Sequence, residues 1–328
     1  MQLLVLGGTA FLSREVCRVA SEAGHAVTAL ARGESGAAPE AVRFVRADRA
    51  DGDALREVAA QQWDAVVDVA REPGQVRHAV RDLARVVDHY VFVSSINAYA
   101  QEAGGTDEQN TPLLSALDGE RMQAPADYGA AKVACEQHVT QAFGADHSLL
   151  VRAGLIGGPG DDTGRSAYWP WRFARSATTG SAVLTPDEPD QPVQLVDVRD
   201  LADFVVRAAQ QRVGGALDAV GPQRTLADVL QTARSVTGHT GPVRTAPSAW
   251  LSEQGVAPWM GSRSLPMWLG GDDTAYPMMR RSGQRARDAG LTTRPLEQTF
   301  GDELATLSAP PPSGLSDDEQ RALLADLA

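Results

Sequence analysis

The stretch Gln2–Ser13, which reads QLLVLGGTAFLS, decides the fold. Residues 2–6 form a continuous, mostly apolar run, which is typical of a parallel strand buried on both faces. Gly7-Gly8-Thr9 predicts a tight turn, and a helical pattern follows as far as Gly24. A strand, a tight turn and a helix form the context of a dinucleotide-binding fingerprint, because the first amides of the helix can receive a pyrophosphate. We therefore predict cofactor-binding roles for Gly7, Thr9, Ala10, Phe11 and Leu12.

The glycine-rich turn is weak evidence when it is taken alone. The fingerprint expects three glycines, and the second and third are replaced by Ala10 and Ser13. Ala10 adds a methyl group where the backbone approaches the phosphates, so it puts cofactor affinity in question. Ser13 stands where a glycine permits close packing of the helix on the strand, which is a milder change.

Further buried strands are predicted as far as residue 153, at 26–31, 42–45, 65–70, 89–94 and 147–153. Helical patterns lie between several of them, around 75–87 and after 128. Strands that alternate with helices predict an α/β fold with a Rossmann-type, doubly wound parallel sheet. In such sheets, ligands bind at the carboxyl ends of the strands, and we place Ala70 and Leu155 at the cofactor for that reason.

The second strand ends at Arg32 without a carboxylate. Folds that select NAD place an acid near this point for the ribose 2′-hydroxyl, whereas an arginine suits the 2′-phosphate of NADP. We therefore favour NADP(H) as the cofactor and keep NAD(H) open. Asp48, after the third strand, is assigned to the adenine side of the pocket, with a simple turn-forming acid as the alternative.

Tyr128 and Lys132 lie four residues apart in the sequence DYGAAK of residues 127–132, so on a helix they share one face. A nearby ammonium group favours the ionised form of a phenol. Lys132 is also the single lysine among 30 Lys and Arg residues, which argues against an ordinary solvated pair. Ser95 ends the strand before this helix, and we predict Ser95, Tyr128 and Lys132 as the catalytic residues.

The composition narrows the class of protein. A net charge of −12 and a pI near 5.0 argue against a nucleic-acid partner. No apolar run is long enough for a membrane span and no basic leader is visible, so we expect a cytoplasmic protein. Cys17 and Cys135 are isolated and fit no metal-ligand spacing, so no metal site is expected.

The character of the chain changes after about residue 165, where tryptophan and proline become frequent. We predict a dinucleotide-binding domain at 1–165, to which 193–222 returns. A smaller substrate-binding lobe is expected at 166–192 and 223–308, followed by a linker and terminal helix at 309–328. Substrate-binding roles are assigned to Asn97, Trp169 and Gln194, although tryptophans in such a lobe also often serve only as core.

Together these motifs resemble the extended (atypical) short-chain dehydrogenase/reductase superfamily, of the NAD-dependent epimerase/dehydratase type. The resemblance covers about residues 1–220 and rests on the turn 7–13, Asp48, Ser94-Ser95, the Tyr128–Lys132 pair and Gly158-Pro159-Gly160. It implies that Tyr128 is the acid/base, that Lys132 holds the nicotinamide ribose, and that Ser95 hydrogen-bonds the reacting oxygen.

The resemblance also limits the reaction. Sugar-nucleotide dehydratases of this type carry an Asp-Glu pair just after the serine, where this chain has Ile96-Asn97, so a 4,6-dehydratase is disfavoured. We favour an NADP(H)-dependent oxidoreductase that reduces a carbonyl or oxidises the alcohol of a small molecule. A nucleotide-sugar-type epimerase with retained NAD(P) stays open, as does a non-catalytic NADP(H)-binding sensor or RNA-associated protein. The partner that we expect is a small-molecule substrate, and a homodimer stays open.

Overall fold

The computed structural model of this protein describes residues 1–100 and 107–327. The chain forms two compact units. The first unit comprises Met1–Gly154, Val198–Val220 and Arg281–Thr292. The second unit comprises Leu155–Asp197, Gly221–Arg280 and the chain from Thr293 onward.

The first unit is built on one parallel sheet, which has seven strands among the described residues. In spatial order these strands are β10 (Gly215–Ala219), β6 (Ser148–Ala153), β5 (Tyr90–Ser95), β4 (Ala65–Asp68), β1 (Gln2–Leu6), β2 (Ala26–Ala31) and β3 (Arg43–Arg46). The chain order reverses between β1 and β4, which is the topological switch point of a doubly wound sheet. The Rossmann-type fold predicted from the sequence is confirmed.

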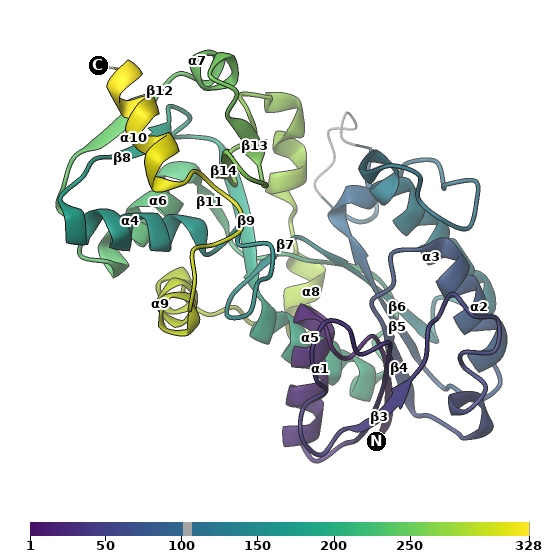
Figure 1. Cartoon of the computed structure of the whole chain (residues 1–328). Helices are drawn as coiled ribbons and strands as arrows, with labels where there is room; N and C mark the ends of the chain where they lie inside the picture. The colour runs from purple at the N-terminus through teal and green to yellow at the C-terminus, as the bar shows by residue number, and fades with distance from the viewer. Residues whose placement is uncertain (101–106, 328) are drawn as a thin grey trace. The chain divides into compact units, whose positions relative to one another are not determined.

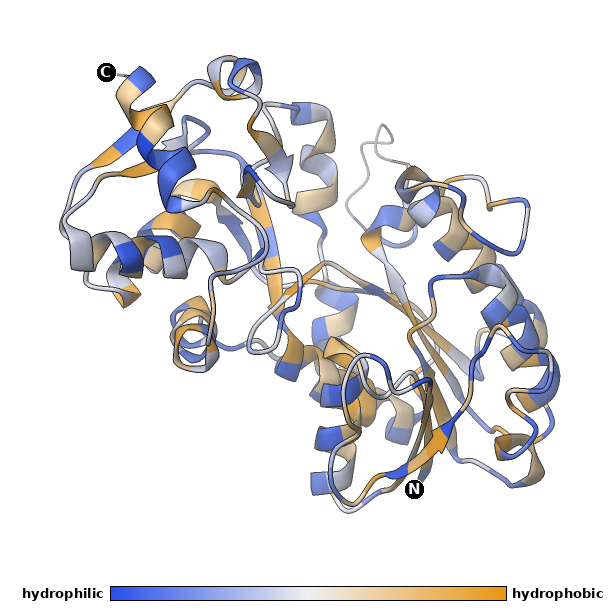
Figure 2. Cartoon of the chain, in the orientation of Figure 1, coloured by the Kyte–Doolittle hydropathy of each residue, from blue (hydrophilic) through white to orange (hydrophobic). Residues whose placement is uncertain are grey.

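Helices cover both faces of this sheet. Figure 1 shows α1 (Phe11–Glu22) and α5 (Val198–Gln211) on one side, and α2 (Pro73–Leu83) and α3 (Tyr128–Phe143) on the other. The short elements of this unit are η1 (Val58–Ala60), η2 (Ile96–Ala98), η3 (Pro125–Asp127) and α8 (Gln284–Asp288). Because the sheet is covered on both faces, its strands need apolar residues throughout. Leu3–Leu6 are all fully buried, and Figure 2 shows hydrophobic residues concentrated along the strands.

The turn after β1 requires glycine. Gly8 has a positive φ of 78°, and a Cβ atom there would lie 2.5 Å from the Cβ of Ala29 on the neighbouring strand β2. A side chain at position 8 would therefore collide with β2, and the turn would have to move away from the sheet edge.

The second unit is a mixed lobe around its own hydrophobic core. Its strands are β7 (Leu155–Gly157), β8 (Val183–Pro186), β9 (Pro192–Asp197), β11 (Gln223–Thr225), β12 (Val243–Ala246), β13 (Ala257–Trp259) and β14 (Ser264–Pro266). Its helices are α4 (Tyr168–Thr179), α6 (Leu226–Val236), α7 (Ser248–Glu253), η4 (Asp273–Arg280), α9 (Leu296–Thr306) and α10 (Asp317–Asp326). Trp169, Trp268, Phe173 and Phe300 are fully or almost fully buried in this core.

The boundaries of the units differ in detail from the predicted domains. Strand β9 pairs with β7 and β11, so residues 193–197 lie in the second unit, and the return to the first unit begins at Val198. Residues 281–292 lie in the first unit, where α8 packs near β10. The substrate-binding role of the second unit stays a prediction. Among the described residues, no helix is both long enough and apolar enough to span a membrane.

Candidate functional site

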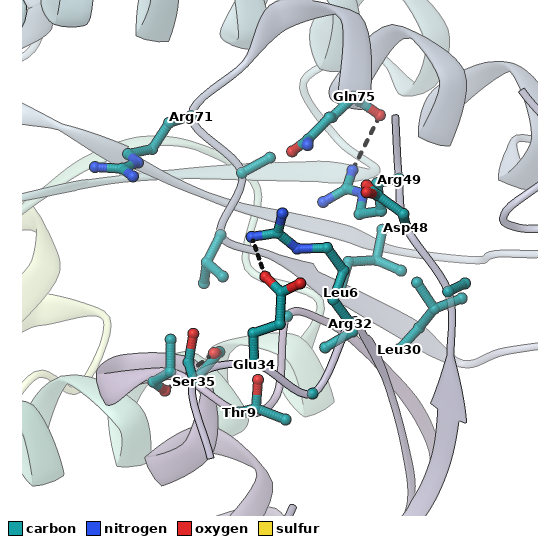
Figure 3. Close-up of a pocket in the computed structure, with 18 of the residues that line it drawn as sticks. Leu6, Thr9, Leu30, Arg32, Glu34, Ser35, Asp48, Arg49, Arg71 and Gln75 are labelled. Carbon is teal, nitrogen blue, oxygen red and sulfur yellow. Dashed lines mark hydrogen bonds and ion pairs between the residues drawn. The ribbon is translucent and has the colours of Figure 1, made fainter. Parts of the chain in front are cut away.

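A pocket with a volume of about 350 Å³ lies in the first unit, at the carboxyl ends of the strands beside the switch point (Figure 3). Four loops meet there, and they follow β1, β2, β3 and β4. The lining residues include Leu6, Gly7, Thr9, Ala10, Ser13, Leu30, Arg32, Glu34, Ser35, Asp48, Arg49, Ala70, Arg71, Glu72 and Gln75. Of the predicted cofactor-binding residues, Gly7, Thr9, Ala10, Arg32, Asp48 and Ala70 line this pocket.

The turn at the pocket keeps its shape despite the two altered glycines. Ala10 is the N-cap of α1 and has an extended backbone, with φ −97° and ψ 166°, which an alanine adopts without strain. Ser13 is buried, and its hydroxyl donates a hydrogen bond to the Ala10 carbonyl at 3.1 Å. The start of α1 therefore still faces the pocket, as the pyrophosphate of a dinucleotide requires. The turn with Ala10 and Ser13 can therefore accommodate a dinucleotide.

The end of β2 carries a carboxylate that the sequence analysis did not consider. Glu34 lies 3.1 Å from the guanidinium of Arg32, and both side chains line the pocket and are more than half exposed (Figure 3). Gly33, with a φ of 78°, makes the turn between them. This end of the pocket therefore offers a cation for a phosphate and an acid for a ribose hydroxyl. Asp48 caps a local turn by accepting from the Ala50 amide at 2.9 Å.

The wall of the pocket is stabilised by a buried ion pair. Arg49 donates two hydrogen bonds to Asp68, at 2.6 and 2.8 Å, and a third to the Gln75 carbonyl at 3.0 Å. Burial alone would raise the pKa of Asp68, but the charge and hydrogen bonds of Arg49 hold that pKa below its ordinary value. Tyr90 also donates to Asp68 at 2.6 Å. Arg49 thus joins β4 to α2, so its role at the pocket is structural.

Arg71 is a second residue that sequence reasoning missed. It follows Ala70 in the loop after β4, it lines the pocket, and it is exposed. Within the described part of the chain, no hydrogen bond or ion pair engages its guanidinium group. The only signal in the sequence was its place immediately after the fourth strand. An unengaged cation in a pocket for a dinucleotide is available to bind phosphate.

Lys132 is buried beneath the carboxyl edge of the sheet. Its ammonium group donates to the carbonyls of Ala70 and Val93, both at 2.7 Å, and lies 4.7 Å from the centroid of the Phe92 ring. The centroid of the Tyr128 ring is 5.8 Å away. An ammonium has three donors, so one remains for a ribose hydroxyl or for the phenol. The sequence could not show that the other two donors would bind the loop after β4 and strand β5.

Ser95 and the start of α3 are brought together by a glycine. Ser95 ends β5, and its hydroxyl exchanges two long hydrogen bonds of 3.2 Å with the amide and side chain of Asn97. A Cβ atom on Gly129 would lie 2.1 Å from the Asn97 carbonyl oxygen, so only glycine permits this approach. Tyr128 therefore begins its helix beside the turn that follows Ser95. Gly129 is a further residue that sequence reasoning missed, although it lies between the two predicted catalytic residues Tyr128 and Lys132.

Several other predicted residues are absent from the lining of the pocket. Trp169 is fully buried in the second unit, where its indole donates to the Pro266 carbonyl at 2.7 Å. This placement agrees with the core role that the sequence left as the alternative, and a substrate-binding role for Trp169 stays a prediction. Gln194 is 2% exposed and donates to the Gly221 carbonyl at 3.1 Å, so its side chain is likewise engaged internally. Leu155 is buried in the same unit. Phe11 and Leu12 begin α1 but are absent from the pocket lining.

The fold and the pocket define a protein with a doubly wound, dinucleotide-binding domain, and the comparisons agree. A model of the NAD dependent epimerase/dehydratase family matches residues 3–219. The chain belongs to this family. It is 34% identical over 192 residues to 2′-dehydrokanamycin reductase of Streptomyces kanamyceticus, a match that covers 57% of this chain and 52% of that protein. The chain thus aligns with about half the length of this curated relative.

Solved structures show the same fold at low identity. UDP-N-acetylglucosamine 4-epimerase from Bacillus cereus has a TM-score of 0.64 at 17% identity, with 94% of this chain and 97% of that chain covered. UDP-glucose 4-epimerase from Thermus thermophilus, solved with NAD, has a TM-score of 0.63 at 17% identity, with 93% and 98% covered. At these identities the similarity establishes the fold alone.

Proposed function

We propose that this protein is an NADP(H)-dependent oxidoreductase that reduces a carbonyl group of a small molecule, or oxidises the corresponding alcohol, at Ser95, Tyr128 and Lys132. The observation that carries the proposal is the packing of α3. Gly129 allows the start of this helix to pack against the turn after Ser95. Lys132 lies on the same helix face as Tyr128, and its ammonium group donates a hydrogen bond to the carbonyl of the pocket residue Ala70. The 34% identity over 192 residues to a protein named as a reductase also supports a reduction reaction.

The side chains present suit the proton chemistry of such a reaction. When bound, NADPH would supply the hydride. Tyr128 would donate a proton to the substrate oxygen, and the third donor of Lys132 would stabilise the resulting phenolate. Among the described residues, the Ser95 hydroxyl is held by two hydrogen bonds of 3.2 Å to Asn97. It can therefore turn to the substrate oxygen and stabilise developing charge there.

The preference for NADP(H) rests on Arg32 at the end of β2, which is exposed in the pocket and fits a 2′-phosphate. Arg71 adds a cation for the pyrophosphate, which both cofactors share, so it supports dinucleotide binding without favouring either cofactor. A second candidate function is an epimerase that retains NAD. It is favoured by Glu34, because a carboxylate at this point can accept the ribose 2′-hydroxyl of NAD.

The test is oxidation of NADPH by the purified protein with a panel of carbonyl substrates. The panel begins with 2′-dehydrokanamycin, for which the relative is named, and includes UDP-sugars for the epimerase. We expect net NADPH consumption with at least one ketone and none in the Tyr128→Phe variant, which should still bind NADPH. Interconversion of UDP-sugars without net NADPH consumption would favour the epimerase. Turnover retained in Tyr128→Phe would refute the site.

A further inference from the structure

The helix α3 presents one polar stripe to the sheet. Tyr128, Lys132 and Glu136 follow one another at intervals of four residues, so they lie one above the next on the same helix face. Lys132 is 2% exposed and Glu136 is 3% exposed, so the two charges are buried between the helix and the strands. Charged side chains are seldom buried without partners, and both have them here.

The two buried charges hold consecutive residues of β5. The Lys132 ammonium donates a hydrogen bond to the Val93 carbonyl at 2.7 Å. The Glu136 carboxylate accepts a hydrogen bond from the Ser94 hydroxyl at 2.5 Å. A hydroxyl bound to a carboxylate makes one of the stronger hydrogen bonds in proteins. The next residue is Ser95, so α3 is fastened to the strand one residue before the hydroxyl of the proposed reaction.

Glu136 is itself held from the other side. Arg152 on β6 donates to both of its oxygens, at 3.0 and 2.7 Å, and also donates to the Tyr99 hydroxyl at 2.8 Å. Tyr99 in turn donates to Asp218 at 2.8 Å, and Asp218 pairs with Arg281 at 2.7 Å. Glu136 and Asp218 are thus each paired with a guanidinium group within this buried network. The Glu136 carboxylate therefore has little freedom to follow a displaced helix.

Stability alone does not require this arrangement. Buried ion pairs contribute little net stability relative to apolar side chains of similar volume, and their best-established use is to fix register. Here the register in question is that of α3 against the end of β5. The contact of Gly129 with Asn97 fixes this register after Ser95 in the chain, and the Ser94–Glu136 hydrogen bond fixes it before Ser95.

We propose that Ser94 and Glu136 are positioning residues, which set the separation between the Ser95 hydroxyl and the Tyr128 phenol. The proposal rests on the proposed function, because it assigns the reacting groups to Ser95 and Tyr128. Three contacts anchor α3 to the end of β5: Gly129 against Asn97, Lys132 to the Val93 carbonyl, and Ser94 to Glu136. Displacements of about 1 Å can reduce turnover up to about 100-fold, so loss of the Ser94 contact should be visible in kcat.

The decisive variant is Ser94→Ala, which removes one hydroxyl and leaves the Glu136–Arg152 pair intact. Its matched control is Ser148→Ala on β6, because Ser148 is also a buried strand serine and donates to the Gly144 carbonyl at 2.6 Å. We expect Ser94→Ala to lower kcat about tenfold, with the dissociation constant for NADPH changed less than about twofold. Ser148→Ala should change neither. A second variant, Ser94→Cys, replaces the hydroxyl by a slightly larger and weaker donor, and its kcat should be intermediate.

A measurement without substrate separates this proposal from the proposed function. The chain has five tyrosines, so tyrosine labelled with ¹³C at the ring carbon bearing the hydroxyl yields a small set of NMR signals. The Tyr128→Phe variant assigns the signal of Tyr128. We expect that signal to shift or broaden in Ser94→Ala with NADPH present, and to be unchanged in Ser148→Ala.

The outcomes are distinct. A lowered kcat together with a moved Tyr128 signal, both specific to the Ser94 variants, supports the positioning role. An unmoved Tyr128 signal, or equal changes in the Ser94 and Ser148 variants, overturns it. If the wild-type protein reduces no carbonyl, the proposed function fails, and the NMR comparison still decides whether Ser94 positions Tyr128.

Discussion

Replacing Arg32 by alanine should weaken binding of NADPH far more than binding of NADH. The guanidinium group lines the pocket at the end of β2 and is 58% exposed, so a 2′-phosphate can reach it. A hydrogen bond to a charged group contributes roughly 1.5–3 kcal/mol. We therefore expect the dissociation constant for NADPH to rise about 10- to 150-fold, while that for NADH changes less than about twofold.

The carboxylate of Glu34, next to Arg32, leads to a second expected change in cofactor binding. Glu34 lies 3.1 Å from Arg32, a separation at which the attraction is about 1.3 kcal/mol in bulk water. Exposed pairs of this kind contribute roughly 0.2–1 kcal/mol when measured. A 2′-phosphate must draw Arg32 away from Glu34, so Glu34→Gln should tighten NADPH binding about 1.5- to 5-fold. The same change should weaken NADH binding, because Glu34 is the available acceptor for its ribose hydroxyl.

Calorimetric titration of each variant with NADPH and NADH measures these changes without any substrate. The effects on NADPH should shrink in high salt, because the groups are exposed. Arg46→Ala is the matched control, since Arg46 is an exposed arginine at the end of β3 that is absent from the pocket lining. Equal weakening of both cofactors in Arg32→Ala, or the same loss in Arg46→Ala, would refute the reasoning.

Three further predictions concern other parts of the first unit. Tyr128→Phe should abolish turnover with unchanged NADPH affinity, as measured by parallel kinetics and titration; a dead variant that also loses NADPH would instead indicate a folding defect. Arg71→Gln should weaken NADPH and NADH binding alike, because both carry the same pyrophosphate; a loss confined to NADPH would contradict that role. Burial lowers the pKa of His89 to about 4, so below about pH 6.5 the unfolded chain takes up a proton that the folded chain does not. Between pH 7 and 5, the free energy of unfolding measured by chemical denaturation should therefore fall by about 1–2 kcal/mol more for wild type than for His89→Leu. If the free energy of unfolding falls equally with pH in both proteins, the lowered pKa of His89 is contradicted.

The sequence by itself determined the architecture of the first unit. Continuous apolar runs predicted the strands at 2–6, 26–31 and 147–153 within a residue, because a parallel sheet covered on both faces needs apolar residues throughout. The spacing of Tyr128 and Lys132 predicted their common helix face for an equally local reason. The glycine-rich turn after the first strand lines the pocket, and its predicted role in binding a cofactor stays a prediction.

Contacts between distant residues were decided only by the tertiary structure. Trp169 was assigned to a substrate, with a core role as the alternative, and it lies in a core, because local sequence does not show what packs against a buried helix face. The partners of Lys132 lie 62 and 39 residues away in the chain, and Glu136 meets Ser94 across 42 residues. Such pairs depend on how α3 packs across the sheet. Periodicity predicts which face of the helix is buried, whereas only the packed fold determines what that face touches.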